Sequence, residues 1–140
     1  MNKSVHVIYW DASAILSALV EDDHTDQALK WLRKPGAHVV STLSYAEVLA
    51  VFERLRRSGV VSEKLVDRSL EGLERELWQR LDLQPAWSDM RSLGSKWSLR
   101  GADLWHLSTA VGLRREISEL ILLTFDNRLR LAAQGEGLAE

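Results

Sequence analysis

Residues 5–13 read VHVIYWDAS, and this stretch decides how the rest of the chain is interpreted. Residues 5–10 are mostly apolar and rich in β-branched and aromatic side chains, which predicts a strand buried on both faces, as in a parallel sheet. Asp11-Ala12-Ser13 follows as a turn, and apolar residues then recur at helical spacing over residues 14–19. A strand, a turn and a helix in this order are typical of an α/β protein.

The same alternation continues to the end of the chain, and it predicts a three-layer α/β/α sandwich around a short, mostly parallel central sheet. No repeat, low-complexity segment or linker interrupts it, so residues 1–140 are expected to form a single domain. The further strands are expected at 38–41, 81–85 and 121–125, and the further helices at 24–33, 44–57, 62–81, 87–97, 102–113 and 126–135.

The composition excludes several classes of protein. The 140 residues include 18 Lys and Arg, 20 Asp and Glu and no Cys, so the chain has no disulfide, no thiolate metal site and no cysteine nucleophile. A net charge of −2 argues against binding nucleic acid through bulk positive charge. No signal peptide and no apolar run of membrane-spanning length is recognisable, which predicts a cytoplasmic protein that does not contact membranes.

Acidic residues follow the two clearest strands. Asp11 ends residues 5–10 and Asp126 ends residues 121–125, and ligands of parallel sheets bind at the carboxyl ends of the strands. Asp103 and Glu47 are both expected in the first turn of a helix, over 102–113 and 44–57 respectively. We therefore expect the four carboxylates to converge in one crevice.

A cluster of four carboxylates requires a compensating charge. Two unit charges about 4 Å apart repel by about 4 kcal/mol at an effective dielectric constant of 20, so such a cluster raises its pKa values or holds a cation. Oxygen ligands without His or Cys favour Mg²⁺ or Mn²⁺ over zinc. A hard divalent ion in an acidic pocket in turn indicates phosphate chemistry, since the ion neutralises phosphate oxygens and activates water.

Each acid, taken singly, also has a purely structural interpretation. Asp11 and Asp126 are suited to cap the helices that follow them. Asp103 can cap its helix or complement the helix dipole. Ser44 and Glu47 have the spacing of a capping box. His106, three residues after Asp103, is expected to be a packed or substrate-side histidine more than a metal ligand.

Four segments in the right order resemble the PIN-domain ribonucleases, in particular the VapC-type toxins of bacterial toxin–antitoxin pairs. The resemblance covers nearly the whole chain. Three segments resemble the D-x-S opening, the S-x-x-E segment and the T-x-D-x-x-L segment of the family, and the fourth resembles its A-D-x-x-H-L-A-T-A helix. The segments are Val7–Ala14, Thr42–Val48, Leu123–Leu129 and, for the helix, Gly101–Ala110.

The resemblance implies an endoribonuclease that hydrolyses single-stranded or looped RNA with the help of one or two Mg²⁺ or Mn²⁺ ions. Asp11, Glu47, Asp103 and Asp126 would hold the metal, with Asp11 and Asp103 as direct ligands. The family also implies a homodimer, silenced by a cognate antitoxin, that acts as a toxin by inhibiting growth or translation.

The same resemblance assigns supporting roles. Ser13 and Thr124 would orient carboxylates or the attacking water. Apart from the resemblance, the position of Arg128 and Arg130 just past Asp126 makes them the basic residues expected to contact RNA phosphates near the cleaved bond.

Other functions are less well supported by the residues. An aspartyl-phosphate phosphatase with Asp11 as nucleophile usually has a second Asp two residues later, where this chain has Ser13. A phospho-acceptor signalling domain needs a lysine after a late strand, and Thr124-Phe125-Asp126 provides none. The last alternative is a PIN fold without catalytic activity that only binds its antitoxin.

Overall fold

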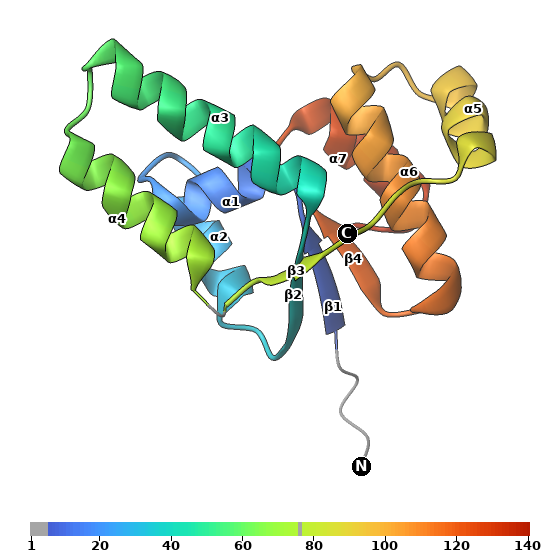
Figure 1. Ribbon diagram of the computed structural model, residues 1–140. Coiled ribbons are helices and arrows are strands. Elements are labelled where there is room, and N and C mark those ends of the chain that lie inside the picture. The colour runs from blue at the N-terminus through green and yellow to red at the C-terminus, as the bar shows by residue number, and fades with distance from the viewer. Residues whose placement is uncertain (1–5, 76) are drawn as a thin grey trace.

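A parallel sheet with the strand order β3-β2-β1-β4 forms the centre of the structure (Figure 1). The structure is a computed structural model and describes residues 6–75 and 77–140. Each pair of neighbouring strands in this part of the chain runs parallel, so the expected parallel sheet is confirmed. The strands are β1 (His6–Trp10), β2 (Gly36–Ser41), β3 (Gln79–Leu81) and β4 (Leu120–Leu123).

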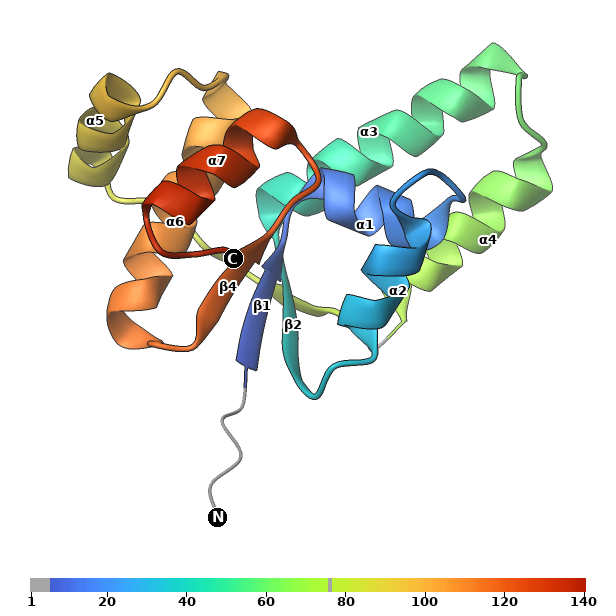
Figure 2. The ribbon, with the colours of Figure 1, turned by 180° about the vertical axis from the view of Figure 1, so that it is seen from behind.

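Helices cover both faces of the sheet, which confirms the three-layer sandwich (Figures 1 and 2). Within the described residues, no helix combines the length and the apolar character needed to cross a bilayer. One face carries α1 (Ala12–Leu19), α2 (Thr25–Leu32), α3 (Thr42–Ser58) and α4 (Glu63–Glu74). The other carries α5 (Trp87–Lys96), α6 (Gly101–Glu116) and α7 (Asn127–Gly135).

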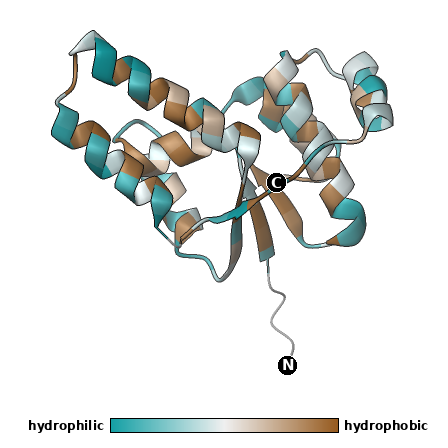
Figure 3. Ribbon diagram, in the orientation of Figure 1, coloured by the Kyte–Doolittle hydropathy of each residue, from teal (hydrophilic) through white to brown (hydrophobic). Residues whose placement is uncertain are grey.

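Strand β1 separates two apolar cores, and this explains why its sequence is apolar at consecutive positions. Ile8 and Trp10 are fully buried in the core beneath α1–α4, whereas Tyr9 is fully buried in the core beneath α5–α7. Successive side chains of a strand point to opposite faces, so a strand covered on both sides needs this pattern. Figure 3 shows β1 and β4 mostly brown, the colour of hydrophobic residues, between layers of helices that carry both hydrophobic and hydrophilic residues.

The predicted helix over 62–81 is wrong in its second half. Helix α4 ends at Glu74, and Arg75 already has an extended backbone, with ψ 158°. Trp78 then packs edge-on against Trp10, with ring centroids 5.4 Å apart. The backbone of β3 pairs with β2, which overrides the helical spacing of the leucines, and the strand therefore precedes the expected 81–85. Val5 and residue 76, included in the predicted elements, lie outside the described residues.

The outer edge of β4 is partly closed by Arg114 and by the segment after α7. The guanidinium of Arg114 donates to the carbonyls of Leu120, at 3.0 Å, and Gly137, at 2.7 Å. The N–H of Leu122 donates to the carbonyl of Leu138 at 2.9 Å. These bonds hold the segment after α7 against β4.

Candidate active site

The carboxyl ends of β1 and β4 place Asp11 beside Thr124. Trp10 and Leu123 are partners in the parallel register, and the N–H of Asp11 donates to the carbonyl of Leu123 at 3.1 Å. The side chains of the next residues on each strand, Asp11 and Thr124, are consequently neighbours at this end of the sheet, and both are buried.

Both oxygens of Asp11 accept hydrogen bonds. Oδ1 accepts from the hydroxyl of Ser13 at 2.7 Å and from the N–H of Ala14 at 2.9 Å, and Oδ2 accepts from the hydroxyl of Thr124 at 2.5 Å. Burial raises the pKa of Asp11, and these hydrogen bonds offset the effect only in part. Asp11 is also the N-cap of α1, so its capping role is confirmed. This role is compatible with its position in the candidate site.

The two hydroxyls that hold Asp11 also connect its turn to the turn after β4. Ser13 Oγ lies 3.3 Å from Thr124 Oγ1 and accepts from the N–H of Phe125 at 3.0 Å. Thr124 Oγ1 accepts from the N–H of Asp126 at 3.1 Å. The backbone that carries Asp126 is thereby fixed relative to Asp11.

Asp126 caps α7 and remains exposed. Its Oδ1 accepts from the N–H of Leu129 at 3.0 Å. As with Asp11, the capping interpretation is correct and does not remove the carboxylate from this end of the sheet.

The capping box predicted for Ser44 and Glu47 is wrong. Helix α3 begins at Thr42, so its N-cap is Ser41, whose hydroxyl accepts from the N–H of Ser44. Glu47 therefore lies in the second turn of the helix and not in the first. Its Oε1 lies 2.6 Å from Nε2 of His106, which is buried in α6.

Asp103 lies in the first turn of α6 and is half-buried. Burial raises its pKa, and the negative charges of Asp126 and Glu47 raise it further. Asp11 and Glu47 likewise both act on the pKa of the buried Tyr9, which burial raises above its ordinary value. The charges of Asp126 and Glu47 thus act on Asp103, and those of Asp11 and Glu47 act on Tyr9, which agrees with the expected convergence of the four acids.

The donor set is chemically suited to a hard divalent cation. The donors are carboxylate oxygens, and their mutual repulsion, seen at Asp103, is the feature that a bound cation relieves. In the described residues, no Lys or Arg forms an ion pair with any of the four acids. Over the same residues, no three acidic or histidine side chains already stand together closely enough to form a finished metal site.

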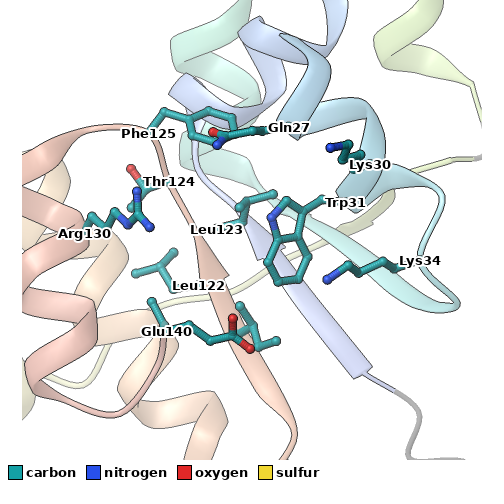
Figure 4. Close-up of a pocket in the computed structure, with 12 residues that line it drawn as sticks. Gln27, Lys30, Trp31, Lys34, Leu122, Leu123, Thr124, Phe125, Arg130 and Glu140 are labelled. Carbon is teal, nitrogen blue, oxygen red and sulfur yellow. The ribbon is translucent and has the colours of Figure 1, made fainter. Parts of the chain in front are cut away.

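A groove begins beside Thr124 and follows the edge of β4 (Figure 4). Its cavity volume is about 330 Å³, and α2, β4 and α7 contribute to its walls. Three cations line it: Arg130, which was predicted as an RNA contact, and Lys30 and Lys34, which were not predicted. Lys30 lies on α2 and Lys34 lies beyond its end, so no spacing within one helix could have indicated their common side. Arg128 is exposed but does not line this groove.

Comparison with known proteins agrees with this architecture. The PIN domain family model matches residues 8–135, and the chain belongs to the PIN-domain family. No curated protein matches the sequence closely enough to count as a relative.

Two solved structures share the fold. VapC20 of Mycobacterium tuberculosis, described as a Sarcin-Ricin loop cleaving toxin, superimposes with a TM-score of 0.58 at 14% identity, covering 89% of this chain and 94% of its own. PAE2754 from Pyrobaculum aerophilum superimposes with a TM-score of 0.62 at 22% identity, covering 94% of this chain and 81% of its own.

Proposed function

We propose that this PIN domain is a Mg²⁺- or Mn²⁺-dependent endoribonuclease and the toxin of a toxin–antitoxin module that inhibits growth or translation. The observation that carries the proposal is the arrangement of the acids: Asp11 and Asp126 follow β1 and β4 and are linked through Ser13 and Thr124, and Glu47 of α3 contacts His106 of α6, the helix that carries Asp103 in its first turn. Membership of the PIN family supports nuclease chemistry at this position. The description of VapC20 as a toxin that cleaves the Sarcin-Ricin loop supports RNA as the substrate class.

In this proposal Asp11, Glu47, Asp103 and Asp126 hold the metal. When bound, the ion would neutralise phosphate oxygens and lower the pKa of a water molecule. The chain itself supplies the positions of the ligands. Three of the acids are held by hydrogen bonds from the protein: Asp11 through both oxygens by two hydroxyls and an N–H, Asp126 through one oxygen by a backbone N–H, and Glu47 through one oxygen by His106.

The groove along β4 is where we place the RNA strand on one side of the cleaved phosphate. It begins at Thr124, next to Asp11, and is lined by three cations, which suit a phosphate backbone, and by the acidic Glu140. Phe125 and Trp31 add partly buried aromatic rings to its lining. Cations combined with aromatic rings are typical of surfaces that bind single-stranded nucleic acid. Arg128 is proposed to contact phosphate outside this groove.

The proposed partners follow from the same family assignment. A cognate antitoxin is expected to silence the enzyme, and the active form is expected to be a homodimer acting on RNA in the cytoplasm. Size-exclusion chromatography with light scattering tests the dimer directly, since a monomeric mass at micromolar concentration contradicts it.

The alternatives predict different behaviour. In the phosphatase alternative Asp11 attacks phosphorus, but the residue two positions later is Ser13, whose hydroxyl donates to Asp11. A phosphatase would release phosphate from a small phosphate ester without cutting RNA. A PIN fold that only binds its antitoxin would do neither.

The decisive experiment is an RNA cleavage assay with the purified chain in Mg²⁺, in Mn²⁺ and in EDTA. We expect cleavage only with a divalent ion. Asp11→Asn is expected to lower the rate at least about a hundred-fold, or about 2.7 kcal/mol of barrier. Asp67→Asn, which removes an exposed carboxylate from α4, serves as the control and should cleave normally. Equal cleavage in EDTA would refute the proposal.

The groove is tested by RNA binding in the Asp11→Asn background, which separates binding from cleavage. Arg130→Gln, Lys30→Gln and Lys34→Gln should each weaken the binding of a short single-stranded RNA. The slope of log K against log salt concentration should become shallower by about 0.7 for each phosphate contact that is lost. Arg91→Gln removes an exposed cation from α5 and is the matched control. If the three groove variants bind RNA as tightly as the Arg91→Gln control, RNA does not follow this groove.

A further inference from the structure

A chain of buried hydrogen bonds runs from the backbone of β1 to the acid cluster. Ser44 Oγ donates to the carbonyl of Trp10 at 2.9 Å and lies 3.2 Å from Ser41 Oγ. Tyr9 Oη lies 2.9 Å from Ser41 Oγ and 2.7 Å from Nδ1 of His106. The other ring nitrogen of His106 lies 2.6 Å from Oε1 of Glu47. The chain thus joins β1, α3 and α6 and ends on a carboxylate.

The direction of each bond from Trp10 to Nδ1 of His106 follows from the first member of the chain. A carbonyl oxygen only accepts, so Ser44 donates its single hydroxyl proton to the carbonyl of Trp10. Ser41 must then donate to Ser44, and Tyr9 must donate to Ser41.

The phenolic oxygen of Tyr9 has therefore no second proton to give to His106, and Nδ1 of His106 is the donor in that contact.

This direction fixes the histidine ring. Nδ1–H is committed to Tyr9, and a turn of the ring by 180° would exchange both nitrogens for carbons and break the bonds to Tyr9 and Glu47 together. The side chain of His106 is only 1% exposed, so solvent cannot readily replace these bonds, whereas the side chain of Glu47 is 32% exposed. The histidine is therefore the fixed member of the pair and the glutamate the member that faces outward.

We propose that His106 is a positioning residue that holds Glu47 by Oε1 and thereby presents its other oxygen to the metal. This inference rests on the proposed metal-dependent function. The residue touches neither substrate nor metal, and it acts through Glu47. Without it, a glutamate that is one-third exposed would be free to adopt other rotamers, and metal binding would have to restrict them.

Two substitutions distinguish the contribution of the Nδ1 hydrogen bond to Tyr9 from that of the Nε2 hydrogen bond to Glu47. In His106→Gln the side-chain amide replaces Nε2, so it can still donate to Glu47. In His106→Asn the shorter amide replaces Nδ1, so it can reach Tyr9 but not Glu47. Each variant loses one hydrogen bond, the buried one to Tyr9 in His106→Gln and the part-buried one to Glu47 in His106→Asn, and each is expected to lose thermal stability. They differ in their effect on Glu47.

The measurements are Mn²⁺ binding without RNA, by electron paramagnetic resonance, and the Mn²⁺ concentration that gives half-maximal cleavage. We expect His106→Gln to stay within about three-fold of the parent and His106→Asn to bind Mn²⁺ at least about ten-fold more weakly, or about 1.4 kcal/mol. Melting temperatures are recorded for both variants, because a purely structural role would make metal affinity follow stability.

The outcomes are distinguishable from failure of the proposed function. If the parent binds Mn²⁺ and cuts RNA while both variants lose metal affinity equally, or neither loses any, the positioning role is overturned and the nuclease assignment stands. If the parent neither binds Mn²⁺ nor cuts RNA, both proposals are overturned. If the variants differ in the expected order at similar melting temperatures, the positioning role is supported.

Discussion

Asp11 and Asp103 belong to the same acid cluster, yet the protein holds them in opposite ways. Asp11, at the end of β1, is 3% exposed and accepts hydrogen bonds from Ser13, Ala14 and Thr124. For Asp103, at the start of α6, the side chain accepts no hydrogen bond from the described residues, and its neighbours Asp126 and Glu47 repel its charge. Asp11 is built into the scaffold, and Asp103 lacks such partners; in the proposed function, the bound cation would stabilise it.

The contrast separates the contribution of an acid to the stability of the fold from its contribution to the proposed chemistry. Removing Asp11 disturbs the fold as well as the chemistry, because its partners lose their acceptor. Removing Asp103 should not destabilise the fold, because no hydrogen-bond donor among the described residues depends on it. Stability measurements in EDTA test this difference without requiring activity.

The largest effect is expected for Asp11→Ala. It leaves the hydroxyls of Ser13 and Thr124 and the first turn of α1 without their acceptor, which we expect to cost about 2 kcal/mol and to lower Tm by about 4–8 °C. Differential scanning calorimetry in EDTA measures the change. Thr124→Val, which removes one of the donors and keeps the shape, should cost less. An unchanged Tm for Asp11→Ala would show that Asp11 is not built into the scaffold.

A smaller effect of opposite sign is expected for Asp103→Asn. Burial raises the pKa of both Asp11 and Asp103 in the folded state, so the negative charge of each opposes folding at neutral pH. Only Asp11 has hydrogen-bond donors that lose their acceptor, so removing the charge of Asp103 should raise Tm in EDTA. Solvent screens part of this repulsion, so we expect a rise of only about 1–2 °C. Adding Mn²⁺ should raise Tm of the parent and leave the variant nearly unchanged. A variant as unstable as Asp11→Ala would remove the contrast between the two acids.

The fold could be predicted from the sequence where its patterns are local. The buried strand β1, the turn at Asp11 and the helix after it follow from residues 5–19 alone, because burial on both faces dictates their composition. The end of α4 could not be predicted, since it depends on Trp78 packing against Trp10 and on β3 pairing with β2.

The candidate site shows the same limit. The four acids were recognisable from their positions after strands and in helices. The partner of Glu47 was not, because it depends on where α3 begins. With Ser44 as N-cap, Glu47 would satisfy its own helix; with Ser41 as N-cap, it reaches His106, 59 residues away in the sequence. The lysines of the groove were missed because they lie on a different element from Arg130.

Arg114 has a consequence for how the molecule behaves at high concentration. An open strand edge is a template on which other chains can stack and begin to aggregate. By occupying the carbonyl of Leu120, and by tying down Gly137 next to it, one guanidinium removes part of that template. Replacing Arg114 would therefore be felt first as a loss of solubility, well before any change in the chemistry at the other end of the strand.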